Sequence, residues 1–204
     1  ENPLCYNYNN VDGTVNMLTL SKEAGVRRFI FSSSASVYGG VDGIPLSERG
    51  PVSALSPYGL QKLVGEQYCE LYSKIYDIET VSLRYFNVFG EGMPTTGSYC
   101  SLIGSFMKRS ADQKPLQIYG DGTQSRDFVY VKDVVAANWA ASQSDNVGKG
   151  ESINVGTAKA TTVNEIAEVF NLPCDFLPKR LEPSISICDN TKAKNLLSWQ
   201  PSVK

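Results

Sequence analysis

The 204-residue sequence contains no histidine. This absence excludes catalytic triads and metal sites that depend on an imidazole. The five cysteines are scattered and form no CxxC pair, which favours reduced thiols over a disulfide framework or a metal centre. We therefore expect no bound metal, and any acid–base chemistry has to come from other side chains.

Strong charge and long apolar runs are also missing. The net charge of −2 gives no reason to expect a nucleic acid or an anionic membrane as partner. No apolar run approaches the roughly 20 residues that span a bilayer, and the polar residues 1–10 show no signal peptide. Together with ordinary fractions of apolar and charged residues, these absences predict a cytoplasmic globular protein.

A glycine-rich phosphate loop is the third absence. Closely spaced glycines occur at residues 39, 40 and 43, at residues 90 and 92, and at residues 120 and 122. None of these groups follows a strand and opens a helix, as the pyrophosphate-binding loop of a dinucleotide site does. The chain therefore lacks most of a dinucleotide site.

Helical and strand patterns alternate along the chain. Helices are predicted over residues 11–24, 58–76, 101–112, 133–141 and 162–170, with a short one within 189–199. Strands are predicted over residues 27–32, 78–84, 116–119, 128–131 and 152–155. Gly25 closes the first helix, and Thr162 with Glu165 forms a capping box for the fifth. This alternation predicts an α/β fold with a parallel sheet.

Tyr58 and Lys62 are the main chemical signal. They lie four residues apart and therefore share one face of a helix. A free phenol ionises near pH ~10, and a neighbouring ammonium favours the phenolate. The residues that follow the two flanking strands, 33–39 and 85–87, are expected at the same edge of the sheet. Tyr58 is therefore a candidate base.

Four segments in this order resemble a known family: FSSSASVYG, SPYGLQK, LRYFNVFG and SRDFVYVKDV. They are similar to the extended short-chain dehydrogenases/reductases, and most closely to the UDP-hexose 4-epimerase group. The resemblance implies a partial Rossmann-type parallel sheet, its C-terminal half, in residues 1–90. A smaller α/β substrate-binding domain would occupy residues 91–204, with residues 125–157 returning to the sheet.

The resemblance also implies roles for individual residues. The catalytic residues would be Tyr58, Lys62 and Ser34. The cofactor would be NAD, contacted by Asn10, Ser32, Ser33, Tyr58, Lys62 and Tyr85. A nucleotide sugar such as a UDP-hexose would be bound by Ser34, Ser36, Asn87, Arg126, Arg180, Glu182 and Ser186.

Several of these assignments have alternatives. Asn10 is equally suited to cap a helix. Arg126 could be a surface arginine paired with Asp127. Lys179 could take the place of Arg180. Leu181 stands where the family usually has glycine, so the local backbone could differ from that of the family.

The residues after Ser34 bear on the reaction. Related dehydratases carry an Asp–Glu pair there to drive elimination, whereas this chain has Ala35 and Ser36. Epimerisation is therefore favoured over dehydration. Other enzymes of the superfamily and a non-catalytic nucleotide-sugar-binding protein remain alternatives. Ser186 aligns with the residue near the hexose C2 substituent, and its small side chain predicts room for a bulky group.

Compared with the family, the chain begins inside the fourth helix, so the first half of the nucleotide-binding sheet is missing. Either the sequence is a fragment of a longer reading frame or it covers only part of the protein. We expect the 204-residue chain alone to bind NAD poorly and to turn over slowly or not at all. The resemblance further implies a homodimer, with the helix over residues 58–76 in its interface.

Overall fold

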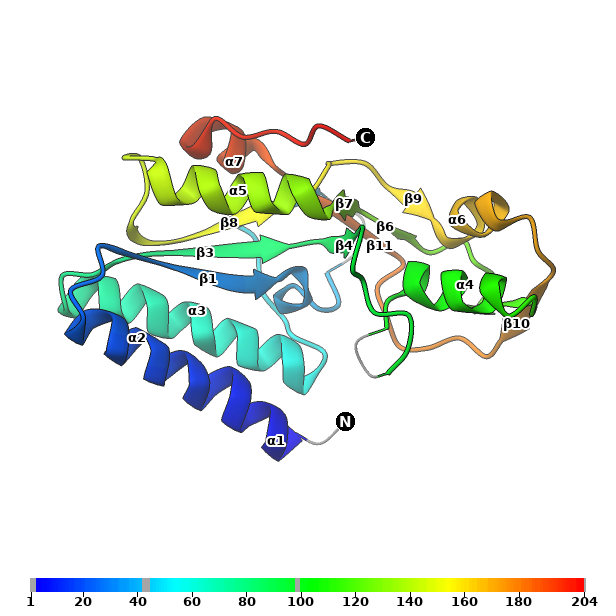
Figure 1. The fold of residues 1–204 in the computed structure, drawn as a ribbon, viewed down its shortest axis with the longest axis horizontal. Helices are drawn as coiled ribbons and strands as arrows, with labels where there is room; N and C mark the ends of the chain where they lie inside the picture. Colours follow the sequence, from blue (N-terminus) through cyan, green and yellow to red (C-terminus); the bar gives the residue numbers. More distant parts are fainter. Residues whose placement is uncertain (1–2, 42–44, 98–99, 204) are drawn as a thin grey trace.

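A three-stranded parallel sheet forms one half of the molecule in the computed structural model, which describes residues 3–41, 45–97 and 100–203. Its strands are β1 (Arg28–Ser34), β3 (Glu79–Tyr85) and β8 (Lys149–Val155), in the order β1-β3-β8. Helices α2 (Gly13–Glu23) and α3 (Pro57–Ile75) lie on one face, and α5 (Val131–Gln143) and α7 (Thr191–Leu197) on the other (Figure 1). Helices on both faces cover the central strand β3, of which residues 80–84 are buried.

The helix before β1 is longer than predicted. Short α1 (Pro3–Asn7), a π-helical turn (Tyr8–Asp12) and α2 follow one another without a break, whereas the sequence predicted a start at residue 11. The predicted end is correct, because Gly25 adopts a left-handed φ of 66°. β1 in turn runs two residues further than predicted and includes Ser33 and Ser34.

A smaller unit lies beyond the carboxyl ends of the sheet strands (Figure 1). It contains α4 (Leu102–Ala111), β5 (Leu116–Tyr119), α6 (Val163–Phe170) and β10 (Cys174–Leu177), with β10 parallel to β5. Its core is formed by Phe106, Leu116, Ile118, Val163 and Ala167. The predicted capping box of Thr162 and Glu165 is present at the start of α6.

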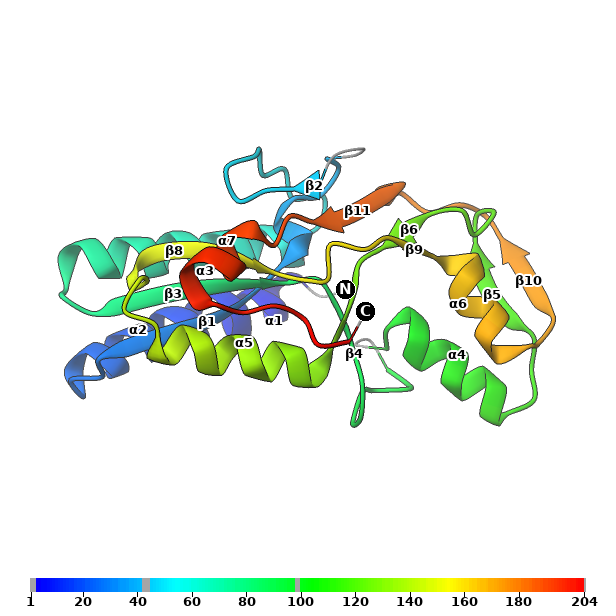
Figure 2. The same ribbon diagram turned by 90° about the horizontal axis from the view of Figure 1, so that it is seen from above.

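Short strands connect the two units, and the sequence analysis missed most of them. β4 (Asn87–Phe89) pairs with β7 (Phe128–Tyr130). β11 (Ile185–Cys188) pairs with β2 (Pro45–Leu46) and β6 (Ser125–Arg126), and β6 pairs with β9 (Thr161–Thr162) (Figure 2). The chain therefore crosses between the units several times, and the predicted division near residue 90 stays a prediction.

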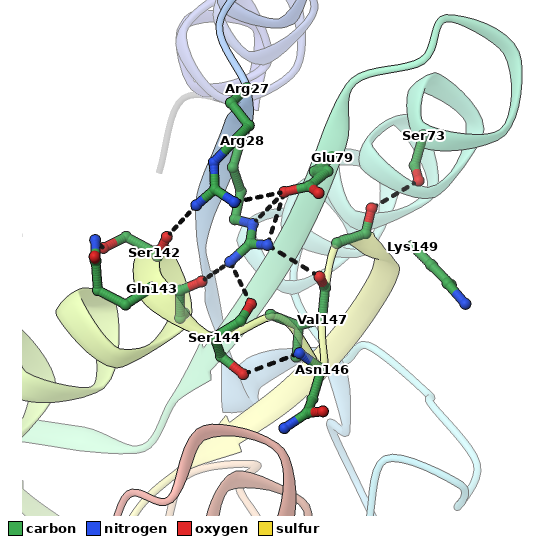
Figure 3. A network of polar contacts seen from close by, with 12 residues as sticks. Arg27, Arg28, Ser73, Glu79, Ser142, Gln143, Ser144, Asn146, Val147 and Lys149 are labelled. Atoms are coloured by element: carbon green, nitrogen blue, oxygen red, sulfur yellow. Dashed lines mark hydrogen bonds and ion pairs between the residues drawn. The ribbon is translucent and has the colours of Figure 1, made fainter.

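A buried arginine closes the amino end of the sheet (Figure 3). Arg28 Nε donates to Glu79 Oε2 at 2.7 Å, and its Nη1 donates to the carbonyls of Ala141 and Ser144 at 2.6 and 2.7 Å. Nη2 donates to the carbonyl of Val147 at 3.2 Å. Arg28 thus holds the segment between α5 and β8 against the start of β1.

The outer faces of α2 and α3 carry exposed apolar side chains, namely Met17, Leu20, Leu60, Leu71 and Ile75. The homodimer inferred from the resemblance stays a prediction. No helix in the described ranges has the length and hydropathy needed to cross a bilayer.

Candidate active site

Tyr58 and Lys62 stand at the start of α3, as predicted. The helix begins at Pro57, and Ser56 caps it by accepting a hydrogen bond from the Gly59 amide at 3.1 Å. Lys62 Nζ donates to the Ser32 carbonyl at 3.0 Å and lies 5.8 Å from the centre of the Tyr58 ring. Burial lowers the pKa of Lys62. The helix thus presents a phenol and an ammonium together at the end of β1.

Ser34 ends β1 and opens a 3₁₀ turn over Ala35–Val37. Its Oγ accepts a hydrogen bond from the Ser36 amide at 3.2 Å. The Oγ of Ser36 is buried and has no hydrogen-bond partner among the described residues. Buried hydroxyls are normally paired, so an unpaired one beside a cavity is consistent with a bound ligand completing it.

A cavity of about 580 Å³ brings most of the predicted site together. The predicted residues that line it are Ser34, Ser36, Tyr58, Tyr85, Asn87, Arg126, Glu182 and Ser186. They come from the sheet half and from the short strands and loop that connect the two units, which places the cavity beyond the carboxyl end of the sheet. Such a crevice beyond the carboxyl ends of parallel strands is where α/β proteins bind ligands.

Three tyrosines line this cavity, and two of them donate hydrogen bonds to asparagine side chains. Tyr38 is buried, donates to Asn154 Oδ1 at 2.7 Å, and has its pKa raised to about 12 chiefly by burial. Tyr85 donates to Asn138 Oδ1 at 2.9 Å. The ring of Tyr58 has its centre 5.8 Å from the Lys62 ammonium.

A second cavity of about 430 Å³ adjoins the first and shares Asn87, Ser101, Arg126 and Glu182 with it. Arg180 lines the second cavity, and its guanidinium lies 3.3 Å from the centre of the Tyr119 ring. Lys179, the alternative to Arg180, lines neither of these two cavities.

Arg126 does not pair with Asp127, so that alternative is wrong. Its Nη2 donates to Glu182 Oε2 at 2.6 Å. Asp127 is fully buried and accepts hydrogen bonds from Thr157 and from the Cys188 amide. Since β6 and β11 are paired with Arg126 opposite Ser186, the strand register places both at the cavity.

The residues predicted to contact NAD lie near the end of β1, but not all are equally available. Ser32 Oγ and Tyr85 Oη are hydrogen-bonded at 3.1 Å close to Lys62. Asn10 Nδ2 donates to Gln61 Oε1 at 2.9 Å, so it has a structural partner. Ser33 is 2% exposed and donates to Glu66, so a cofactor contact from this residue would come from its backbone.

This donor set fits the nicotinamide end of NAD. Ammonium, hydroxyl and phenol groups can hydrogen-bond to ribose hydroxyls and a carboxamide. These groups cluster at β1, the edge strand of the sheet. The described glycines supply no phosphate loop, so the fit covers one half of the cofactor.

Sequence reasoning missed Ser101 and Asn138. Ser101 lines both cavities and caps α4 by accepting from the Gly104 amide at 3.3 Å. A serine before an apolar run is a recognisable cap signal, but its place at the cavity depends on the fold. Asn138 orients Tyr85 from α5, and no sequence pattern links two residues that far apart.

The fold is an α/β fold with a cavity beyond the carboxyl ends of its parallel strands and a tyrosine–lysine pair beside it. The NAD dependent epimerase/dehydratase family matches residues 1–156, and the chain belongs to this family. A putative UDP-glucose 4-epimerase from Methanocaldococcus jannaschii is 39% identical over 212 residues, covering 100% of this chain and 67% of that protein.

Solved structures agree with this assignment. UDP-N-acetylglucosamine 4-epimerase from Methanobrevibacter ruminantium, in complex with UDP-N-acetylmuramic acid, superimposes with a TM-score of 0.93 at 33% identity. It is matched over 98% of this chain and 66% of its own length. UDP-glucuronic acid 4-epimerase from Bacillus cereus, in complex with UDP-glucuronic acid and NAD, has a TM-score of 0.86 at 34% identity, over 97% of this chain and 63% of its own. The chain thus spans about two thirds of these proteins, and NAD, the expected cofactor, is present in the second structure.

Proposed function

We propose that the protein containing this chain is an NAD-dependent nucleotide-sugar 4-epimerase that acts on UDP-hexoses. The observation that supports this most strongly is the convergence of Tyr58, Ser34 and Arg126 on one cavity, with Lys62 beside the phenol. In this proposal Tyr58 is the base, Ser34 orients the sugar hydroxyl and Arg126 binds the diphosphate, as a reaction on a nucleotide sugar requires.

In this mechanism Tyr58 removes the proton from the C4 hydroxyl of the sugar. The Lys62 ammonium favours the phenolate, because an opposite charge close to an acid stabilises its ionised form. Ser34 hydrogen-bonds the same hydroxyl and holds it toward Tyr58. NAD, held beside Lys62 and Tyr85, would supply the acceptor and then the donor of the C4 hydride. After the 4-keto sugar has turned its other face, Tyr58 gives the proton back.

The two adjoining cavities suit the two ends of a nucleotide sugar. The sugar would occupy the cavity with Tyr58 and Ser34, and the nucleotide the cavity with Arg180 and Tyr119. Arg126 borders both and is therefore the candidate to bind the diphosphate. A guanidinium has five N–H donors and can grip two phosphate oxygens at once. Glu182 holds it in place at 2.6 Å.

The substrate's C2 group is proposed to lie near Ser186. This small side chain lines the sugar cavity opposite Arg126 in the strand register. It leaves room for an N-acetyl group. The Ser186→Tyr variant is therefore expected to lose turnover of UDP-N-acetylhexosamine more than turnover of UDP-glucose, and equal loss on both would refute this assignment.

The deciding experiment incubates the whole protein with NAD and a panel of UDP-hexoses, and detects C4 epimers by NMR. Tyr58→Phe should lower kcat by about 10²- to 10⁴-fold, because general acid–base catalysis contributes that much, while nucleotide-sugar binding is retained. Tyr76→Phe is the matched control, since Tyr76 lies just beyond the far end of α3 and is 42% exposed. Binding without turnover of any sugar would instead favour a non-catalytic nucleotide-sugar-binding protein.

A further inference from the structure

We propose that Glu66 and Arg84 are positioning residues, whose buried ion pair sets where Tyr58 stands relative to Ser34. The inference rests on the proposed epimerase function of the site. Both side chains are 6% exposed, and neither lines the cavity that contains Tyr58 and Ser34. Any effect on the reaction must therefore pass through the residues they hold.

Glu66 lies on the catalytic face of α3. It follows Tyr58 and Lys62 at intervals of four residues, so the three side chains form one row along the helix. Lys62 reaches the Ser32 carbonyl of β1, and Glu66 reaches the hydroxyl of the next residue, Ser33. A fixed Glu66 therefore fixes both the rotation and the height of the helix that carries the base.

The Glu66 carboxylate is bonded to all three strands of the sheet. Arg84 of β3 binds it in a bidentate manner, with Nε donating to Oε1 at 2.9 Å and Nη2 to Oε2 at 2.6 Å. Ser33 of β1 donates to Oε1 at 2.5 Å, and Ser152 of β8 donates to Oε2 at 3.0 Å. A planar fork with two further donors leaves the carboxylate one orientation.

The third nitrogen of Arg84 reaches the turn that begins at Ser34. Nη1 donates to Tyr38 Oη at 2.9 Å, and Tyr38 Oη donates to Asn154 Oδ1 at 2.7 Å. Tyr38 directly follows the Ala35–Val37 turn, which Ser34 caps. The Arg84 guanidinium therefore connects α3, which carries Tyr58, with the turn that begins at Ser34.

Close packing makes this connection stiff. A Cβ on Gly59 would lie 2.5 Å from the Ser36 carbonyl, and a Cβ on Gly65 would overlap the Phe31 ring. The helix therefore packs closely against the Phe31 ring of β1 and against the backbone of the turn. A shift of α3 translates into a changed separation of Tyr58 and Ser34.

Two serines provide a matched test in the whole protein. Ser33→Ala and Ser152→Ala each remove one hydroxyl donor to the same carboxylate. Ser33 precedes Ser34, while Ser152 lies on β8 and lines no part of the sugar cavity. Since a displacement of about 1 Å can cost about 100-fold, Ser33→Ala should lower kcat roughly 10-fold, with KM and NAD affinity within about twofold. Ser152→Ala should stay within about twofold of wild type. A wild-type kcat in Ser33→Ala would overturn the proposal.

A stronger variant removes the pair completely. Glu66→Met with Arg84→Met leaves no unpaired buried charge, and such replacements often preserve folding. We expect kcat to fall about 100-fold while KM changes little. A folded double variant with wild-type kcat would refute the positioning role, and if it does not fold, the two serine variants decide.

A readout without turnover separates this inference from the proposed function. In protein with isotope-labelled tyrosine, the NMR signal of Tyr58 is assigned with Tyr58→Phe and followed through a pH titration. The signal should titrate differently in Ser33→Ala but not in Ser152→Ala. Identical titrations overturn the inference even if the wild type epimerises sugars. Absence of wild-type turnover on every nucleotide sugar contradicts the proposed function alone.

Discussion

The sheet carries an arginine–glutamate pair near each of its ends: Arg28 with Glu79 at the amino end, and Arg84 with Glu66 toward the carboxyl end. Both arginines are nearly inaccessible, at 4% and 6% exposed. The glutamates differ, since Glu79 is 41% exposed and Glu66 only 6%. The Glu79 carboxylate therefore keeps much of its hydration, whereas the Glu66 carboxylate is bonded to protein donors in place of water.

The other partners of the two arginines differ as well. Arg28 donates to three backbone carbonyls as well as to Glu79, so its charge is dispersed over four acceptors (Figure 3). Arg84 donates to Glu66 and Tyr38, which are both side chains. Burial disfavours its charged form, yet the hydrogen bonds and charge of Glu66 raise the pKa of Arg84 overall. At the amino end of the sheet, Arg28 is bonded mainly to backbone carbonyls. At the end next to the site, Arg84 depends on its ion pair with Glu66.

The largest effect should follow from breaking the buried pair on one side. Glu66→Ala leaves the Arg84 guanidinium buried without its carboxylate, and breaking such a pair typically costs about 3–5 kcal/mol. Urea unfolding should therefore show a large drop in the free energy of unfolding. A drop below about 1 kcal/mol, as for an exposed pair, would show that the buried Arg84–Glu66 pair is no stronger than the partly exposed Arg28–Glu79 pair.

An intermediate effect is expected from Arg28→Met. It leaves the carbonyls of Ala141, Ser144 and Val147 without this donor, and unpaired buried polar groups cost about 1–3 kcal/mol. Hydrogen exchange should rise in the segment between α5 and β8, while kcat stays near wild type because the site lies at the other end of the sheet. A fall in kcat comparable to that of the Glu66/Arg84 double variant would mean that both ends position the site.

The sequence could predict features that depend on near neighbours in the chain. The Tyr58–Lys62 face, the capping box of Thr162 and Glu165, and the strand over residues 116–119 were all foreseeable, because spacing and composition carry them. The short strands β2, β6, β9 and β11 were not foreseeable. Three of them have only two residues, and the pairing of all four is set by partners that are distant in the sequence.

The same limit applies within the site. Glu66 continues the spacing of Tyr58 and Lys62 and could have been noticed as a third member of that face. Its role could not, because Ser33, Arg84 and Ser152 become its partners only when three strands lie side by side. Arg126 finds Glu182 across 56 residues of sequence, and its neighbour Asp127 was the plausible but wrong choice.

The smallest effect should come from Glu79→Ala, which removes the more exposed of the two carboxylates. Arg28 keeps its three carbonyl acceptors in this variant, so its charge is not left alone. A partly exposed ion pair typically contributes about 0–1 kcal/mol and weakens as salt screens it. The variant should therefore lose less than about 1 kcal/mol at low salt, and the loss should shrink in high salt. Glu66→Ala should keep its deficit in salt, because its partner is buried. A salt-independent loss at Glu79 as large as that at Glu66 would show that exposure of the carboxylate does not decide the strength of these two pairs.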